Sequence, residues 1–176
     1  MSEAPRCSRR SFVARLALAA GVASPLVALL DGEPAALARG EETDLAVLYA
    51  AIALEHQAIA LYDLGLRRGL VPAGLRDYAI EFRGDHEGHR DTQIAIAEER
   101  GGRPPAPLSA YEFGALAAGD RFLRHALEVE GAAQRAYATL LSRIRSSEYL
   151  LSAAFVLIDE VRHVTVWRRV LGLKVY

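Results

Sequence analysis

Residues 82–91 read FRGDHEGHRD and place two histidines three residues apart among several charged side chains. Two imidazoles at this spacing could bind a metal ion, act as a pair of bases, or lie on a solvated helix face. The zinc-protease pattern His-Glu-x-x-His is disfavoured, because these two histidines are one residue too close together. The role of the segment therefore depends on which side chains the other elements place opposite it.

Four helices are predicted for the chain and no strand, since alanine, leucine, arginine and glutamate dominate the periodic segments. Their ranges are 43–68, 73–100, 120–145 and 148–171. Short turns join the first two and the last two helices, so each pair is antiparallel. About 18 residues separate the pairs and reach ~59 Å when extended, which exceeds the ~39 Å length of a 26-residue helix. The expected fold is all-α, a four-helix bundle with one long crossover.

Each predicted helix carries an apolar stripe, spaced by three and four residues, that contains polar groups a core does not normally hold. The third stripe consists of Leu123, Leu127, Glu130, Gln134, Tyr137, Leu141 and Ile144. The fourth consists of Tyr149, Ala153, Val156, Glu160, His163, Trp167 and Val170. Across all four stripes the acids and histidines are Glu55, His86, His89, Glu130, Glu160 and His163.

A single group of this kind usually has a structural explanation, such as pairing with an arginine or a satisfied core histidine. Burying an unpaired charge costs several kcal/mol. Groups at matched depth in four helices are harder to explain as independent accidents. One cluster of divalent ions would compensate all of them at once, so the stripes predict a shared metal site.

The two halves of the chain repeat this pattern. Glu55 precedes His89 by 34 residues, and Glu130 precedes His163 by 33. The segments LEHQAIALY and VEGAAQRAY also share the same spacing from glutamate to tyrosine. We interpret these tyrosines, Tyr62 and Tyr137, as core aromatics with hydrogen-bonded hydroxyls rather than redox groups.

The chemistry that suits this arrangement is a dinuclear carboxylate–histidine centre. Two divalent ions need hard anionic oxygens, and imidazole nitrogens suit iron and manganese. In bundle proteins such sites take one glutamate from each of two helices and a Glu-x-x-His pair from each of the others.

The segments ALEHQAIALY, DHEGHRD, ALEVEGAAQRAY and DEVRH resemble the ferritin-like superfamily over residues 42–171, in particular exported bacterial members. The resemblance implies a centre of two iron or manganese ions, with oxidoreductase activity on iron or reactive oxygen species such as peroxide, or on dioxygen. It also implies ligand roles. Glu55 and Glu130 are terminal or bridging ligands, Glu160 bridges, and His89 and His163 each bind one metal.

One position departs from the family pattern. The second helix should carry Glu-x-x-His, and this chain has His86-x-x-His89. Asp85 could supply the missing carboxylate, because Glu55 precedes Asp85 by the same 30 residues that separate Glu130 from Glu160. The heptad frame favours His86 instead. A third interpretation is an eroded site that holds fewer metals, in a bundle with a structural or partner-binding role.

Several other side chains carry weaker expectations. Asp159 could orient a histidine or lie on the surface. His56 lies about 100° around the helix from Glu55, so a surface or interface position is expected. Gly84 and Gly88 lie behind the stripe and could allow another segment to approach closely.

The first 38 residues resemble a twin-arginine export signal. Arg9 and Arg10 precede an apolar run, and a small-residue cleavage site follows at 36–38. A retained membrane anchor is disfavoured, because Arg15, Gly21 and Pro25 interrupt the run. We therefore expect a mature chain of residues 39–176, exported to the periplasm or another extracytoplasmic space, with no stable membrane span.

Composition excludes several other classes. The chain has 176 residues, 52% of them hydrophobic and 24% charged, with a net charge of −1, which suits one domain with a core. It lacks a basic stripe, so nucleic acid is not an expected partner. The only cysteine is Cys7, which would leave with the signal. No extra C-terminal helix of the cage-forming kind is evident, so a small homo-oligomer is expected rather than a storage shell.

Overall fold

The computed structural model describes residues 40–175, with side chains described from Asp44 onward. The predicted export signal, residues 1–38 with Cys7 and the cleavage site, lies outside the described residues. The regular structure of the described part is entirely helical. Its elements are α3 (Gly40–Arg67), the short 3₁₀ helix η2 (Ala73–Leu75), α4 (Arg76–Glu99), α5 (Asp120–Leu140) and α6 (Ser147–Val170). The predicted all-α four-helix bundle is confirmed.

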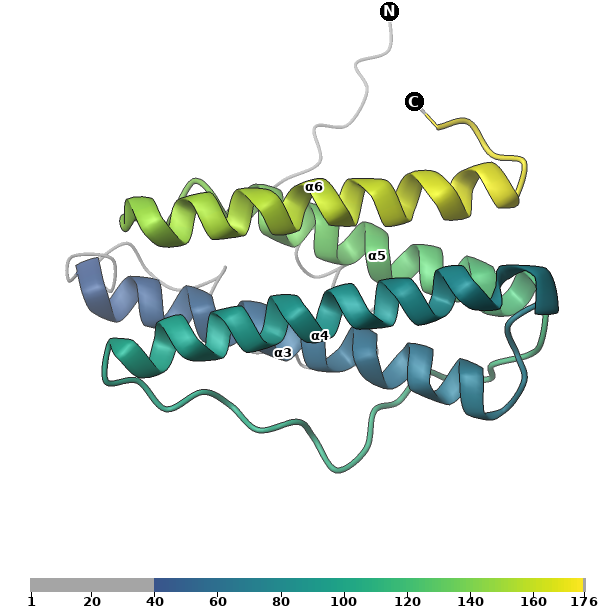
Figure 1. The fold of residues 1–176 in the computed structure, drawn as a ribbon, viewed down its shortest axis with the longest axis horizontal. Helices are drawn as coiled ribbons and strands as arrows, with labels where there is room; N and C mark the ends of the chain where they lie inside the picture. Colours follow the sequence, from purple (N-terminus) through teal and green to yellow (C-terminus); the bar gives the residue numbers. More distant parts are fainter. Residues whose placement is uncertain (1–39, 176) are drawn as a thin grey trace, which may run out of the picture.

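Two antiparallel hairpins build the bundle (Figure 1). α3 and α4 form the first and α5 and α6 the second, while α3 also packs against α5 and α4 against α6. The segment between α4 and α5 runs along the length of the bundle, as expected from its length, so α4 and α5 point the same way. Each helix therefore has two antiparallel neighbours, and side chains at mid-depth of all four can meet at the centre.

The helix ends differ from prediction mainly at α5, which stops at Leu140 rather than at residue 145. The reason is a contact that is remote in sequence. The buried carboxylate of Asp44 accepts the backbone N–H groups of Arg145 and Ser146 at 3.0 and 2.9 Å, which draws the chain out of the helix. Ser146 then caps α6 by accepting the N–H of Tyr149.

A glycine with positive φ follows each helix of the α3–α4 hairpin. Gly69 follows α3 with φ +64°, and Gly101 follows α4 with φ +72°, values that strain any side chain with a Cβ. The expectation for Gly84 and Gly88 is wrong. Both face open space, with nothing within 4 Å of an added Cβ, so none of the described segments approaches α4 there.

The apolar core consists of two clusters on either side of a polar layer. One contains Leu48, Ile52, Tyr137 and Tyr149, among others. The other contains Tyr62, Phe82, Phe122 and Trp167, among others. The acids and histidines of the four stripes lie between these clusters, which keep water from the polar layer along the bundle axis.

The stripe of α6 is confirmed from Tyr149 to Trp167, and only Val170 is exposed. The stripe of α5 is correct at Leu123, Glu130 and Tyr137 but wrong between them. The buried residues there are Ala126, Ala133 and Leu140, whereas Leu127, Gln134 and Leu141 are half-buried. The predicted and the observed stripe of α5 both pass through Glu130 and Tyr137 at helical spacing, so periodicity alone could not distinguish them. The predicted stripe was preferred because it contains the larger leucines.

Among the described residues, Asp44–Arg67 of α3 is long and apolar enough to cross a membrane by length and composition alone. Within the bundle, 61% of the most apolar 18-residue stretch of this helix is buried. Packing against the other helices therefore explains why the helix is so apolar.

Candidate metal centre

The structure brings six of the seven predicted ligands together in the polar layer. Glu55 comes from α3, His86 and His89 from α4, Glu130 from α5, and Glu160 and His163 from α6. All are fully buried except His89, whose side chain is 11% exposed. They form two overlapping groups of potential ligand atoms, each with all its atoms within 4.8 Å of one another.

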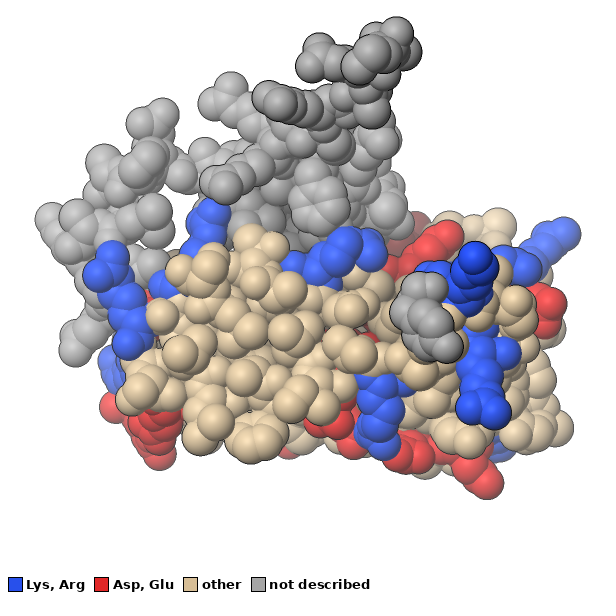
Figure 2. All heavy atoms as spheres, turned by 90° about the horizontal axis from the view of Figure 1, so that it is seen from above, with Lys and Arg blue, Asp and Glu red and all other residues tan. Residues whose placement is uncertain are grey.

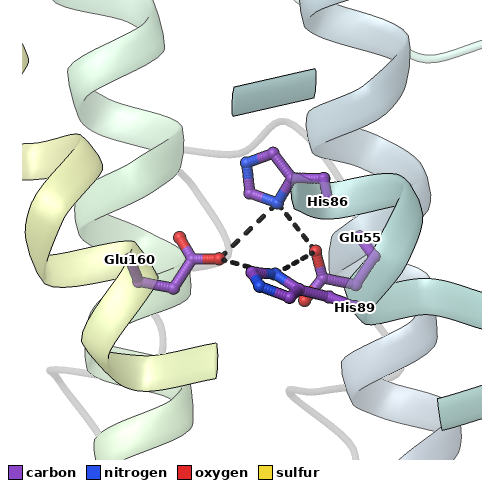
Figure 3. Close-up of side chains that lie close together, drawn as sticks. All are labelled: Glu55, His86, His89 and Glu160. Carbon is purple, nitrogen blue, oxygen red and sulfur yellow. Dashed lines mark hydrogen bonds and ion pairs between the residues drawn. The ribbon is translucent and has the colours of Figure 1, made fainter. Parts of the chain in front are cut away.

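The first ligand group contains Glu55, His86, His89 and Glu160. Figure 3 shows these four side chains pointing toward one another from α3, α4 and α6. His86 Nδ1 lies 2.7 Å from Glu55 Oε2 and 3.5 Å from Glu160 Oε1. His89 Nδ1 lies 3.8 Å from the same two oxygens. The four atoms thus surround one small space.

The second ligand group contains His86, Glu130, Glu160 and His163. His86 Nε2 lies 3.4 Å from both carboxylate oxygens of Glu130, and His163 Nδ1 lies 3.2 Å from Glu130 Oε2. His86 and Glu160 belong to both groups. The His86 ring therefore stands between the two spaces, with Nδ1 facing the first and Nε2 facing the second.

Three buried atoms of this centre lack a hydrogen-bond partner within the described part of the chain. They are both carboxylate oxygens of Glu160 and Nδ1 of His89. A buried carboxylate without a partner costs several kcal/mol, and a cation between these atoms would compensate that cost. Carboxylate oxygens with imidazole nitrogens form a donor set that suits iron and manganese. The residues therefore fit the metal ions that the sequence predicts.

The pKa values of the three buried glutamates are shifted in different directions. Burial alone would raise the pKa of Glu55, but its hydrogen bonds with His86 and His89 lower it to about 2. Burial also opposes ionisation of Glu130, yet the charges and hydrogen bonds of His86 and His163 hold its pKa well below the usual range. Glu160 goes the other way. Burial and the charges of Glu130 and Glu55 outweigh His86 and raise its pKa well above the usual range.

His86 completes this balance. Burial favours its neutral form, but the charges of Glu130 and Glu160 raise its pKa well above the usual value. In the metal-free protein, protons on His86 and Glu160 thus reduce the repulsion between the carboxylates. A bound cation would reduce the same repulsion in their place. Metal binding at such a centre must displace protons.

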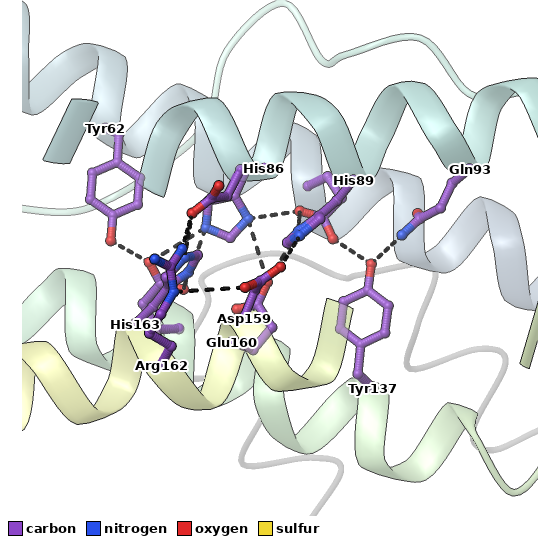
Figure 4. Close-up of polar contacts among 12 residues, drawn as sticks. Tyr62, His86, His89, Gln93, Tyr137, Asp159, Glu160, Arg162 and His163 are labelled. Carbon is purple, nitrogen blue, oxygen red and sulfur yellow. Dashed lines mark hydrogen bonds and ion pairs between the residues drawn. The ribbon is translucent and has the colours of Figure 1, made fainter. Parts of the chain in front are cut away.

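Two tyrosines link the halves of the bundle at opposite ends of the polar cluster (Figure 4). The Tyr62 hydroxyl donates to Glu130, and the Tyr137 hydroxyl donates to Glu55, so each tyrosine reaches the glutamate of the other half. The predicted hydrogen-bonded hydroxyls are confirmed. Burial, together with the neighbouring glutamate, raises the pKa of each tyrosine well above its usual value, so both remain O–H donors that orient a carboxylate.

Each tyrosine is held in turn by a donor from the diagonally opposite helix. Trp167 Nε1–H donates to the Tyr62 oxygen at 2.8 Å, and Gln93 Nε2–H donates to the Tyr137 oxygen at 2.5 Å. Neither donor is predicted from the sequence to contact the centre. A signal existed, because Gln93 and Trp167 each follow the last histidine of their helix by four residues.

Asp85 lies outside both ligand groups, so the structure gives the place of the missing glutamate to His86. Asp85 Oδ2 instead accepts from His163 Nε2 at 3.1 Å and from Arg162 at 2.5 Å. Asp159 has the matching position, with Oδ2 3.2 Å from His89 Nε2, which confirms that it contacts a histidine. A carboxylate can only accept, so each aspartate holds Nε2–H and leaves Nδ1 to face the ligands.

His56 does not lie on the surface, which is one of the two positions expected for it. The residue is only 8% exposed and lies beneath the crossover, where Nε2 is 3.2 Å from the carbonyl oxygen of Pro105. The crossover is remote in the sequence, so the periodicity of α3 could not reveal this cover.

Residues 43–173 match a family model described as the ferritin-like domain. Among solved structures, the chain is similar to a conserved hypothetical protein, Rv2844, from Mycobacterium tuberculosis, with a TM-score of 0.71 and 24% sequence identity. The match covers 76% of this chain and 94% of that one. At this identity the likeness shows the fold alone. No curated protein sequence matches the chain significantly.

Proposed function

This chain belongs to the ferritin-like domain family, and from that premise we propose that it binds two iron or manganese ions and acts as an oxidoreductase on iron, peroxide or dioxygen. The observation that supports this most is the buried Glu160 carboxylate. It has no hydrogen-bond partner within the described residues and is shared by both ligand groups. A carboxylate in this position would be available to a cation in either ligand group.

The two metal positions have unequal donors because of His86. A neutral imidazole carries one N–H and one lone pair. The 2.7 Å contact from Nδ1 to Glu55 is the shorter one, so Nδ1–H donates there and the Nε2 lone pair faces the second group. The second position then has four donors, His86, Glu130, Glu160 and His163. The first keeps three, Glu55, His89 and Glu160. We expect the second position to bind more tightly.

A pair of bound iron or manganese ions supplies two-electron redox chemistry. The chain's own residues prepare the place for it. Tyr62 and Tyr137 orient Glu130 and Glu55 through their hydroxyl protons. The apolar clusters on either side limit the access of water. His89 is 11% exposed and is the most exposed of the six side chains, so we expect a small oxidant to approach the centre from its side.

The test is metal titration of chelator-treated protein with Fe(II) under anaerobic conditions and with Mn(II). We expect about two ions per chain, and oxidation of bound Fe(II) when air is admitted. The variant Glu160→Ala/His163→Ala should bind neither ion tightly. His125→Ala/Glu128→Ala is the matched control, because it removes the same residue types from an exposed pair on α5 and should bind like the wild type.

The second candidate is a bundle without resident metals that serves a structural or partner-binding role. His86 supports it, because its contacts with Glu55 and Glu130 compensate buried charge internally. If the wild-type protein binds no iron or manganese in these titrations, this second function stands and the first is rejected.

We also propose that the protein is exported through its twin-arginine segment, on the basis of residues 1–38 alone. Replacement of Arg9 and Arg10 by lysine should retain the full-length precursor in the cytoplasm of the native cell. Export of the variant at the wild-type level, seen by fractionation and N-terminal sequencing, would reject the proposal.

A further inference from the structure

The two tyrosines of the centre are held by donors of different chemistry. Trp167 Nε1–H donates to the Tyr62 oxygen, and Gln93 Nε2–H donates to the Tyr137 oxygen. An indole has one N–H and no acceptor, so Trp167 can only donate. A primary amide has N–H donors and a carbonyl acceptor, so Gln93 can exchange one for the other when its amide group flips. The two tyrosines therefore differ in the hydrogen bonds open to them.

The proton of Tyr62 has one acceptor among the described residues. The Tyr62 oxygen accepts from Trp167, so its own O–H is directed to Glu130. The two rings are fully buried and stack with their centroids 6.5 Å apart, which fixes this arrangement. Tyr62 therefore holds one oxygen of Glu130 whatever the charge of the centre.

The proton of Tyr137 has two acceptors within reach. It goes to Glu55, while the buried carbonyl oxygen of Gln93 has no hydrogen-bond partner among the described residues. A flip of the amide would place that oxygen beside the Tyr137 hydroxyl, which would then donate to Gln93 instead. Either orientation leaves one polar group of the amide unpaired, so the amide itself favours neither strongly. The bond to Glu55 is preferred because its acceptor is a carboxylate.

The charge of Glu55 is what decides where the Tyr137 proton goes. Gln93 and Tyr137 are fully buried, so water does not take part in the exchange. Glu55 is the only charged group among the described hydrogen-bond partners of the Tyr137 hydroxyl. Figure 2, which looks onto α6, shows a broad field without charged side chains on that side of the bundle. A change in the charge of Glu55 therefore acts on this pair directly.

We propose that Gln93 is a positioning residue that lets Tyr137 release Glu55 when cations occupy the centre. The proposal rests on the metal binding proposed above. Once a cation offsets the charge of Glu55, the amide of Gln93 flips and accepts the O–H of Tyr137. The proton stays on the Tyr137 oxygen throughout, and only its acceptor changes. Both oxygens of Glu55 then serve the first ligand group, whereas Glu130 keeps one oxygen bonded to Tyr62.

Infrared difference spectroscopy tests which acceptor Tyr137 uses. Spectra of the metal-free and the Mn(II)-loaded full chain are subtracted, with unlabelled and with ring-labelled tyrosine. Tyr137 donates and accepts in the metal-free protein, so its C–O stretching band should move on loading toward that of a hydroxyl that only donates. Tyr62 is the internal control, because Trp167 continues to donate to it and its band should keep its character. The variants Tyr137→Phe and Tyr62→Phe assign the two bands.

Gln93→Met tests the same role by calorimetric titration with Mn(II). Methionine has a similar length but only a weak acceptor, so Tyr137 stays on Glu55, which then offers one oxygen instead of two. We expect the weaker of the two affinities to fall by roughly threefold to tenfold, as for one lost contact, and the tighter one to be unchanged. Gln57→Met is the matched control and should bind like the wild type, because Gln57 is a buried glutamine of α3 outside both ligand groups.

The outcomes separate this role from the metal binding on which it rests. Mn(II) binding with an unmoved Tyr137 band, or wild-type affinities in Gln93→Met, overturns the role of Gln93 alone. A wild-type protein that binds no Mn(II) or Fe(II) overturns both. The infrared test uses the native side chain, so it decides the matter even where Gln93→Met folds poorly.

Discussion

At the scale of single residues, the centre is defined by side chains whose burial is costly unless a cation or protons compensate them. Glu160 is the extreme case, with both oxygens buried and without a hydrogen-bond partner in the described part of the chain. Its neighbours Glu55 and Glu130 are satisfied by histidine and tyrosine. Such a residue costs stability in the metal-free protein, and the proposed metal ions would offset that cost.

Glu160→Gln separates these two effects. Glutamine keeps the shape of the side chain but removes a carboxyl group whose pKa is raised by burial and by Glu130 and Glu55. We expect at least a tenfold loss of Fe(II) or Mn(II) affinity, while the free energy of unfolding of the metal-free protein is unchanged or higher. Urea unfolding with a chelator present measures the second quantity. A loss of more than about 1 kcal/mol there would show that Glu160 stabilises the fold.

His86→Glu restores the acid that the family pattern places on α4. A carboxylate can serve both ligand groups, whereas one neutral imidazole offers a single lone pair. Wild-type protein should bind its two ions with dissociation constants at least tenfold apart, and the variant should narrow that gap. Calorimetric titration measures both constants, and His86→Gln controls for loss of the imidazole. Equal affinities in the wild type would contradict the unequal positions.

At the scale of elements, neighbouring helices decide what a given sequence position does. Asp44 at the start of α3 ends α5 and helps begin α6, although about 100 residues separate them. Glycines show the same dependence. Gly65 of α3 faces the buried ring of Phe122, where an added Cβ would lie 2.2 Å from Cζ. Gly84 of α4 faces open space.

Alanine substitutions at these two glycines should therefore have opposite effects. Gly84→Ala should raise the free energy of unfolding by about 0.5–1 kcal/mol, because alanine favours a helix and its Cβ meets nothing. Gly65→Ala gains the same propensity but forces Phe122 to move, so it should lower stability by about 1–3 kcal/mol. Urea denaturation measures both changes. Two changes of the same sign would show that propensity outweighs packing here.

At the scale of the whole molecule, the proposed metal binding would be linked to folding, because the candidate ligands come from all four helices. An unfolded chain has no such site, so ions bound at the centre would stabilise only the folded state. The reciprocal contacts from each tyrosine to the glutamate of the other hairpin couple the two halves in the same way.

Removal of metal should lower the melting temperature. At a free ion concentration 100 times the dissociation constant, one site contributes about 2.7 kcal/mol, which corresponds to roughly 9 °C for this domain at about 2.1 cal/mol/K of unfolding entropy per residue. Calorimetric melting with and without a chelator measures the shift. Glu160→Ala/His163→Ala should melt at one temperature in both conditions. A shift of equal size in that variant would place the stabilising ion elsewhere.

The sequence by itself determined the four helices, the crossover and five side chains of the centre, namely Glu55, His89, Glu130, Glu160 and His163. These depend on local periodicity and on chain length, since a glutamate or histidine on an apolar stripe must enter the core wherever the stripe packs. The glycine stops after α3 and α4 are equally local, because a residue with positive φ excludes a Cβ.

Only the tertiary structure decided whether Asp85 or His86 enters the centre and which face of α5 is buried. It also decided that His56 is covered by the crossover rather than exposed. Adjacent positions on a helix differ by 100° of rotation, and spacing alone leaves that rotation open within one face. Packing against the neighbouring helices sets it. That rotation directs the His86 side chain into the centre and places Asp85 beside His163 Nε2, outside both ligand groups.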